Sequence, residues 1–171
     1  MTFDLQPHLH GPTLSLRPMV AADLEPLWQV SCDPLVWAQH PEPSRATRAG
    51  FEHFFAGGLA SGGALVVTSN PSGKIIGSSR YYDWDAQRRE VAIGYTFIAR
   101  DYWGGAANHE MKRLMLDHAF HWADTVWFHV ASSNLRSRRA MEKIGGHLAH
   151  EEQRPIQGQL VDFVYYRIDK A

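Results

Sequence analysis

A short turn of small side chains, Gly104-Gly105-Ala106-Ala107, is the part of the sequence best suited to bind a ligand. It follows residues 93–98, which are β-branched and aromatic and predict a strand. The residues after the turn predict a helix from Asn108, its expected N-cap, to Ala123. A strand, a glycine-containing turn and a helix present free backbone N–H groups where a phosphate or pyrophosphate can bind. A turn that merely starts a helix is the alternative, because neither the Walker ending nor the spaced glycines of the dinucleotide fingerprint are present.

A second polar motif, Asn134-Leu135-Arg136-Ser137, begins another predicted helix over residues 135–144. Asn134 and Ser137 are three residues apart and share a face. They could bind a ligand, or they could simply cap the helix.

These segments resemble the GNAT acetyltransferase superfamily and, within it, the RimJ/RimL-like branch of ribosomal-protein alanine acetyltransferases. Three further motifs contribute to the resemblance: Leu16-Arg17-Pro18, Ile93-Gly94-Tyr95 and Tyr102-Trp103-Gly104. The most specific piece is the Asn-x-x-Ser…Glu-Lys-x-Gly pattern from Asn134 to Gly145. The resemblance covers nearly the whole chain from about Thr13. It implies an α/β (α+β mixed) acyl-CoA N-acyltransferase fold, with a central, mostly antiparallel mixed sheet flanked by helices.

The resemblance also implies that acetyl-CoA lies where the strand over residues 90–98 splays from the strand over residues 125–132. The pantetheine arm would pair with the first of these strands, and the pyrophosphate would bind the glycine turn. The cofactor-binding residues implied in this way are Thr96, Phe97, Ile98, Trp103, Gly104, Gly105, Ala106, Ala107, Asn108, His109, Asn134, Ser137 and Arg138. Arg136, Arg138 and Arg139 could pair with the 3′-phosphate, or they could form a solvated basic face.

The sequence departs from the family pattern at positions that matter for catalysis and cofactor binding. Met141 stands where the superfamily has a tyrosine general acid, and Ala92 stands where it has a glutamate. Glu90 is the nearest replacement base, with Asp83 as an alternative, and the resemblance makes Ser137 a candidate to protonate the departing thiolate, a role that water or another residue could also fill. In the phosphate turn, Ala106 stands where family members usually have glycine, and Asn108 stands where they have glycine or alanine.

The elements that must position these residues follow from periodicity and turn signals. We expect strands over residues 13–19, 64–69, 74–82, 90–98, 125–132, 146–153 and 160–168, and further helices over residues 21–32 and 48–59. The resemblance implies that the helices over residues 21–32 and 48–59 and their connection form one wall of the acceptor site. Trp37 and His40 could line this wall, or they could pack in the core or at its rim. We expect residues 1–12 to be a frayed or loosely docked arm and residues 13–171 to be a single GNAT-like domain.

Composition narrows the class of protein. The 17 basic and 18 acidic residues give a net charge of −1, which does not favour binding to nucleic acid or to a membrane surface. A single cysteine, Cys32, and the lack of a long apolar run or signal pattern favour a cytoplasmic protein. The ten histidines lack metal-ligand spacing, so no metal is expected; His129 is a minor catalytic candidate.

The sequence thus predicts an acetyl-CoA-dependent N-acetyltransferase that transfers the acetyl group directly to a primary amine, on a peptide or protein N-terminus or on a small molecule. The alternative is a catalytically weak acyl-CoA-binding module with a regulatory or partner-assembly role, which Met141 and Ala92 would favour. Homodimers are common in families of this kind, but no residue here demonstrates one.

Overall fold

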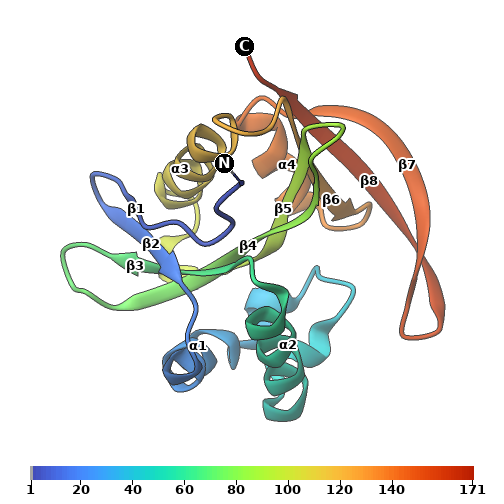
Figure 1. Ribbon diagram of the computed structural model, residues 1–171. Coiled ribbons are helices and arrows are strands. Elements are labelled where there is room, and N and C mark those ends of the chain that lie inside the picture. The colour runs from blue at the N-terminus through green and yellow to red at the C-terminus, as the bar shows by residue number, and fades with distance from the viewer. Residues whose placement is uncertain (1) are drawn as a thin grey trace.

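Eight strands form one sheet around which the molecule is built (Figure 1). The computed structural model describes residues 2–171. The strands are β1 (Leu9–His10), β2 (Leu14–Pro18), β3 (Ala64–Ser69), β4 (Ile75–Asp85), β5 (Glu90–Ile98), β6 (Thr125–Ala131), β7 (His147–Ile156) and β8 (Gln159–Asp169). Their order across the sheet is β1-β2-β3-β4-β5-β6-β8-β7. All neighbours are antiparallel except β5 and β6, which are parallel. The predicted mixed α/β fold with a mostly antiparallel sheet is confirmed.

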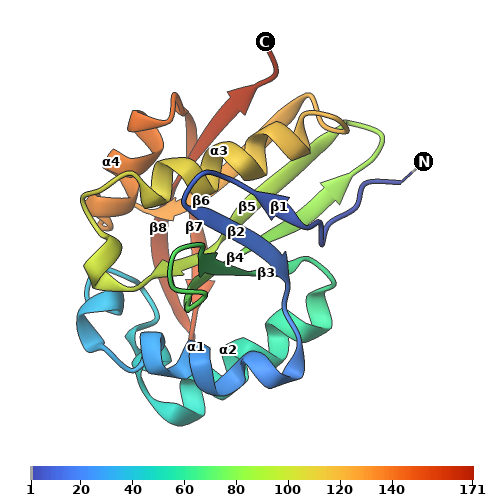
Figure 2. The ribbon, with the colours of Figure 1, turned by 90° about the vertical axis from the view of Figure 1, so that its left-hand side faces the viewer.

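Helices cover both faces of the sheet (Figures 1 and 2). One face carries α1 (Leu24–Ser31) and α2 (Arg48–Ser61), which are joined through 3-10 turns at Pro34–Trp37 (η2) and Pro43–Ala46 (η3). The other face carries α3 (Ala107–Ala119) and α4 (Leu135–Lys143). The predicted helices and strands match these elements to within a few residues at each end, the usual uncertainty of element boundaries.

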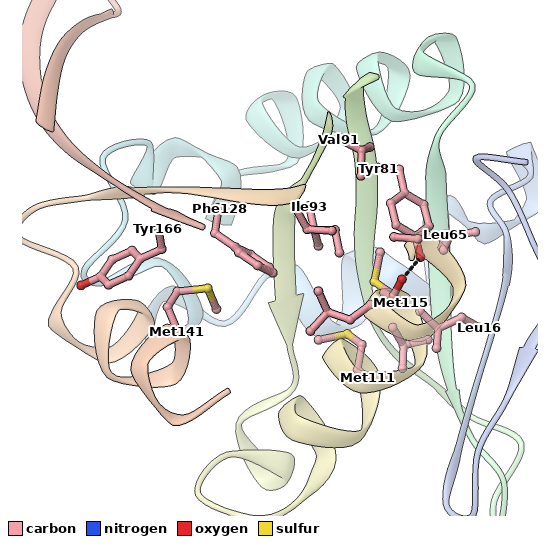
Figure 3. Close-up of a cluster of buried hydrophobic side chains, with 14 of the residues drawn as sticks. Leu16, Leu65, Tyr81, Val91, Ile93, Met111, Met115, Phe128, Met141 and Tyr166 are labelled. Atoms are coloured by element: carbon pink, nitrogen blue, oxygen red, sulfur yellow. Dashed lines mark hydrogen bonds between the residues drawn. The ribbon is translucent and has the colours of Figure 1, made fainter. Parts of the chain in front are cut away.

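Each face of the sheet has its own apolar core. Under α3 and α4, side chains such as Ile93, Met111, Met115 and Phe128 pack together (Figure 3). Tyr81 is also buried there, and its O–H donates a hydrogen bond of 2.5 Å to the carbonyl of Met115. The core under α1 and α2 is mainly aromatic, with Trp37, Phe51, Phe54, Phe55 and Phe97. Burial of both sides explains why the central strands are apolar along most of their length.

The parallel strands β5 and β6 stay together only briefly. Their register pairs Glu90 with Thr125, Val91 with Val126 and Ala92 with Trp127, and no pairing follows. On its other side, β5 carries one extra residue relative to β4 between Gly94 and Phe97, which is a β-bulge. Tyr95 lies in this bulge with a left-handed backbone conformation, φ 53°. The two central strands therefore diverge just after Ala92.

The first residues differ from the expected loose arm. Phe3 is only 8% exposed, and its ring contacts Tyr81 and Trp84 at centroid distances of 5.3 and 5.0 Å. The Glu110 carboxylate, in the first turn of α3, accepts hydrogen bonds from the N–H groups of Thr13 and Leu14 at 3.1 and 2.6 Å. The apolar content of this segment was too sparse to predict its docking. No helix within residues 2–171 is long and apolar enough to cross a membrane.

Candidate functional site

A cavity of about 640 Å³ opens where β5 and β6 diverge. Its walls come from residues 93–98 of β5, residues 128–131 of β6, the turn before α3, the start of α4, and the loop between η2 and η3. Residues of β7 and β8 close one side. Segments far apart in the sequence thus meet at the one place where two central strands do not pair.

The glycine turn has the shape that an anion requires. Gly104 has φ 73°, a conformation that favours glycine, and a side chain at Gly104 or Gly105 would meet nothing within 4 Å. The helix α3 begins at Ala107, and its N-cap, Ala106, provides no side-chain hydrogen bond. The prediction of Asn108 as N-cap was wrong, because this residue is already the second of the helix. No side chain within residues 2–171 caps α3, so its first N–H groups could bind an anion.

Most of the predicted cofactor-binding residues come together around the cavity. The ones that line it are Thr96, Phe97, Ile98, Trp103, Gly104, Gly105, Asn108, His109, Asn134 and Ser137. Ala106 and Ala107 instead line a smaller depression beside Thr13 and Leu14. Both alanines nevertheless belong to the turn that carries the free N–H groups.

Asn134 and Ser137 combine capping with a position at the cavity. The Asn134 side chain accepts a hydrogen bond of 3.2 Å from the Ser137 N–H and so caps α4. Asn134 is 6% exposed, whereas the Ser137 hydroxyl has no hydrogen bond within residues 2–171. Capping, one of the two interpretations of this motif, is therefore observed, and Ser137 also lines the cavity.

The three arginines of α4 have different surroundings. Arg138, predicted to bind the cofactor, does not line the cavity; it donates hydrogen bonds to the Tyr166 hydroxyl at 3.2 Å and to the Ser132 carbonyl at 3.0 Å. Arg139 does line the cavity. Arg136 also lines the cavity, and it lies over the Trp103 ring with its Cζ 3.7 Å from the ring centroid.

Glu90, the predicted base, is not brought to the cavity. It lies at the start of β5, opposite Asp85 of β4 and Thr125 of β6, where the central strands still pair. Strand alternation places Glu90 on the same face as Ala92, but it does not move the carboxylate along the strand to the point of divergence.

Lys112 is the main site residue that the sequence analysis missed. It lines the cavity from α3, is 2% exposed, and donates a hydrogen bond of 2.7 Å from Nζ to the Thr96 hydroxyl. Its Nζ also lies 5.6 Å from the centroid of the Phe128 ring. Burial lowers the pKa of Lys112 to about 7. A signal was present, because Lys112 lies four residues before Leu116 and adjoins Met111, within the apolar stripe of α3.

His129 lies on the opposite face of the divergence, beside a tyrosine. Its Nδ1 is 3.0 Å from the Tyr82 hydroxyl, and its ring stacks on Tyr165 at 4.2 Å. A side chain at Gly94 would contact the Tyr82 ring at 3.0 Å, so glycine at this position leaves room for that ring. Burial, followed by the charge of Arg154, lowers the pKa of His129 to about 4, which keeps the imidazole neutral at pH 7.

The loop between η2 and η3 adds charged groups to the same end. Arg45 forms an ion pair of 2.5 Å with Glu42 and contacts His40 Nε2 at 3.3 Å. Burial and the nearby Arg45 and Arg136 guanidinium groups lower the pKa of His40 to about 3. Of the two residues that the sequence analysis suggested for this wall, His40 lines the cavity. Trp37 is 2% exposed and belongs to the core. No group of His, Cys, Asp or Glu side chains within residues 2–171 could hold a metal ion.

Known proteins resemble this chain both in sequence profile and in fold. A family profile described as acetyltransferase (GNAT) domain matches residues 13–147. A GCN5-related N-acetyltransferase from Brucella melitensis superposes with a TM-score of 0.85 at 20% identity, over 96% of this chain and 79% of that one. A GNAT-family acetyltransferase from Bacillus anthracis gives 0.79 at 18% identity, over 95% and 98% of the two chains. No curated protein sequence matches significantly.

Mycobacterium smegmatis RimJ, solved in complex with CoA-disulfide, is also similar, with a TM-score of 0.75 at 18% identity over 96% of this chain and 88% of that chain. At such identities these structures share the fold. The family itself is established by the domain match, which spans most of the chain. The chain belongs to the GNAT family of acetyltransferases, enzymes that transfer acetyl groups.

Proposed function

We propose that this protein is an acetyl-CoA-dependent N-acetyltransferase that acetylates a primary amine by direct transfer. The observation that carries the proposal is the divergence of β5 and β6 after Ala92, because it leaves the polar edge of β5 facing a cavity instead of a neighbouring strand. The acceptor is a peptide N-terminus, as for RimJ/RimL-like enzymes, or a small-molecule amine.

The residues present fit acetyl-CoA. The backbone of residues 96–98 would hold the pantetheine arm as an added strand, and the free N–H groups of residues 104–109 would hold the pyrophosphate. Arg139 and Lys143 lie on the same wall and suit the 3′-phosphate. The bound thioester would supply an activated acetyl group, so the protein mainly has to position the amine and move protons.

The two proton transfers would take place on opposite faces of the sheet, at the point where β5 and β6 diverge. Lys112, Thr96 and Ser137 lie on the face covered by α3 and α4. Tyr82 and His129 lie on the other face, where Tyr95 packs against Phe54 of α2. This separation would let one face take a proton from the incoming amine while the other gives one to the departing thiolate.

Lys112 is the stronger candidate to protonate the thiolate in place of the missing tyrosine. A lysine with a pKa of about 7 is partly protonated at neutral pH and can transfer its proton to a thiolate, whose ordinary pKa is about 8.5. Thr96 holds the Nζ in place through its hydroxyl. Ser137 remains a second candidate, since it lines the cavity.

His129 is the candidate to receive the amine proton, directly or through water. It is neutral at pH 7, it lines the cavity, and its Nδ1 is held by Tyr82. Glu90 is not retained for this role, because the paired part of the sheet separates it from the cavity.

Calorimetric titration with acetyl-CoA and CoA, followed by an amine screen read by thiol release, tests the proposal. Micromolar binding with amine-dependent thiol release supports it. Binding without release from any amine would instead favour the acyl-CoA-binding module, for which Met141 in the cavity wall is the main argument. A lack of binding at millimolar ligand would rule out both.

A further inference from the structure

Arg80 on β4 is a buried cation that has no hydrogen-bond acceptor or carboxylate partner within residues 2–171. It is 8% exposed, no hydrogen bond or ion pair of its side chain occurs within residues 2–171, and its Nε is fully buried and unsatisfied. Leaving a buried charge unpaired is costly for the folded state, and such groups normally have a carboxylate or a ligand beside them. The unpaired guanidinium of Arg80 therefore suggests that an anion binds beside it.

A second guanidinium lies close to Arg80 on the same aromatic side chains. The Cζ of Arg80 is 3.8 Å from the Tyr95 ring centroid and 5.7 Å from that of Phe54, while the Cζ of Arg45 is 4.4 Å from Phe54. The Glu42 carboxylate pairs with Arg45 and neutralises only one of the two cations. Burial lowers the pKa of each arginine, and the Glu42 carboxylate opposes this shift only for Arg45.

The lining of the cavity shows this excess more widely. Six lining side chains are cationic, whereas Glu42 is the one carboxylate among the described lining residues, although the whole chain carries a net charge of −1. Arg136, Arg139 and Lys143 come from α4, the cofactor wall. Arg45 and Arg154 lie instead on the wall formed by the η2–η3 loop and β7, where no cofactor phosphate is expected.

A chain of ring contacts connects the unpaired charge to the reacting end. Tyr95 stacks on Arg80, the Tyr82 and Tyr95 ring centroids are 5.1 Å apart, and those of Tyr82 and His129 are 5.6 Å apart. Arg80 does not itself line the cavity, but Tyr95 does. Tyr95 is 39% exposed, so its ring can turn aside to let a ligand group reach the guanidinium.

We propose that the acceptor is a primary amine that also carries an acid group, a carboxylate or phosphonate, and that Arg80 and Arg45 bind this group. Their planar forks suit two-point recognition of such anions. The proposal rests on the proposed acetyl transfer and names its substrate class. A free amino acid and a peptide with an acidic first residue share this chemistry.

Matched acceptors with and without the acid group provide the test. We expect kcat/KM for β-alanine and aminoethylphosphonate to exceed that for propylamine by roughly tenfold to a hundredfold. Peptide amides that begin with Asp or Asn distinguish a peptide acceptor from a free amino acid. The Arg80→Met variant should lose the advantage of the acid-bearing acceptors, and Arg88→Met, which changes an arginine whose side chain is 76% exposed, should retain it.

A binding measurement without CoA separates this proposal from the transferase function. β-Alanine should raise the melting temperature of the wild-type protein and of Arg88→Met, but not that of Arg80→Met. Equal use of propylamine and β-alanine would overturn the substrate class and leave the transferase function standing. If no amine is acetylated, the melting shift still decides whether Arg80 binds the acid group. An equal shift in Arg80→Met would overturn the assignment.

Discussion

The two ends of the cavity are built in different ways. The cofactor end consists mainly of backbone: the free edge of β5, the glycine turn and the uncapped start of α3, all within residues 93–109. The acceptor end consists of side chains, with Arg45 from η3, Tyr82 from β4, His129 from β6 and Arg154 from β7. One end is a contiguous stretch of chain, and the other exists only after several elements have packed together.

This difference determines what each end can recognise. A backbone cradle binds any phosphate or strand-like arm and tolerates replacements such as Ala106, because side chains contribute little to it. A set of convergent side chains instead discriminates by charge and shape, and a single replacement changes the ligand that it accepts. In the proposed function, the fold would thus specify the cofactor and individual residues would specify the acceptor.

Lys112 breaks this division, because it is a side chain that acts at the cofactor end. Lys112→Met should lower turnover about a hundredfold, as expected for loss of a general acid, while the Kd for acetyl-CoA changes by less than about threefold. Steady-state rates and calorimetry measure the two quantities. Lys74→Met, in an exposed turn, is the control. An equal loss of affinity and turnover would make Lys112 a binding residue instead of an acid.

Stability gives a second readout of Lys112. Its folded pKa of about 7 lies below the ordinary lysine value of 10.5, so the unfolded chain binds one more proton between these pH values. The unfolding free energy of the wild type should therefore rise relative to Lys112→Met from pH 7 to pH 10.5, by up to roughly 1.4 kcal/mol per pH unit. Parallel curves from urea unfolding would show that Lys112 is not buried.

Gly105 tests whether the cofactor end is a backbone cradle. Gly105→Glu places a carboxylate in open space beside the start of α3, where it should repel the pyrophosphate and raise the Kd for CoA about tenfold or more. Gly57→Glu is the matched control, since it also meets open space but on the exposed side of α2. Equal CoA affinity of the two variants would exclude the turn as the phosphate seat.

His129 tests the acceptor end. His129→Gln should lower kcat about tenfold with little change in the affinity for CoA, because Tyr82 holds its Nδ1 and the lowered pKa keeps the imidazole unprotonated at pH 7. His150→Gln is a close control, as His150 packs on the same Tyr165 ring at 4.5 Å but does not line the cavity. If both variants lose kcat equally, packing on Tyr165 explains the effect.

The smallest effect is expected for the arginines of α4. Arg139→Ala should weaken CoA about threefold but leave dephospho-CoA unaffected, because only CoA carries the 3′-phosphate. Arg138→Ala should instead lower thermal stability through the loss of its bonds to Tyr166 and Ser132. Loss of CoA affinity in Arg138→Ala would reverse this assignment.

The fold and the cofactor end were largely predictable from the sequence. Alternating strands, turn residues and one apolar helix face are local signals, and they gave nearly every element with its approximate bounds. The glycine turn is likewise contiguous. The misplaced N-cap shows the limit, because an uncapped helix start leaves no side-chain signal, and asparagine was the one good cap nearby.

The acceptor end could not be predicted, for physical reasons. Arg80 has no carboxylate partner within residues 2–171, and sequence spacing does not report such an absence. Glu90 illustrates the reverse case: its strand and face were predicted, but its distance from the cavity depends on where β5 and β6 part. Lys112 was within reach, since a lysine in an apolar stripe marks a buried charge.

The position of β8 between β6 and β7 has a consequence for biosynthesis. During translation β7 emerges before β8, yet β8 is the strand that it pairs with, so β7 has no neighbour until β8 has left the ribosome. Arg154 lies on β7 and Phe163 on β8, and both line the acceptor end. A nascent chain could therefore assemble the cofactor cradle first, and would complete the acceptor end only with the final hairpin.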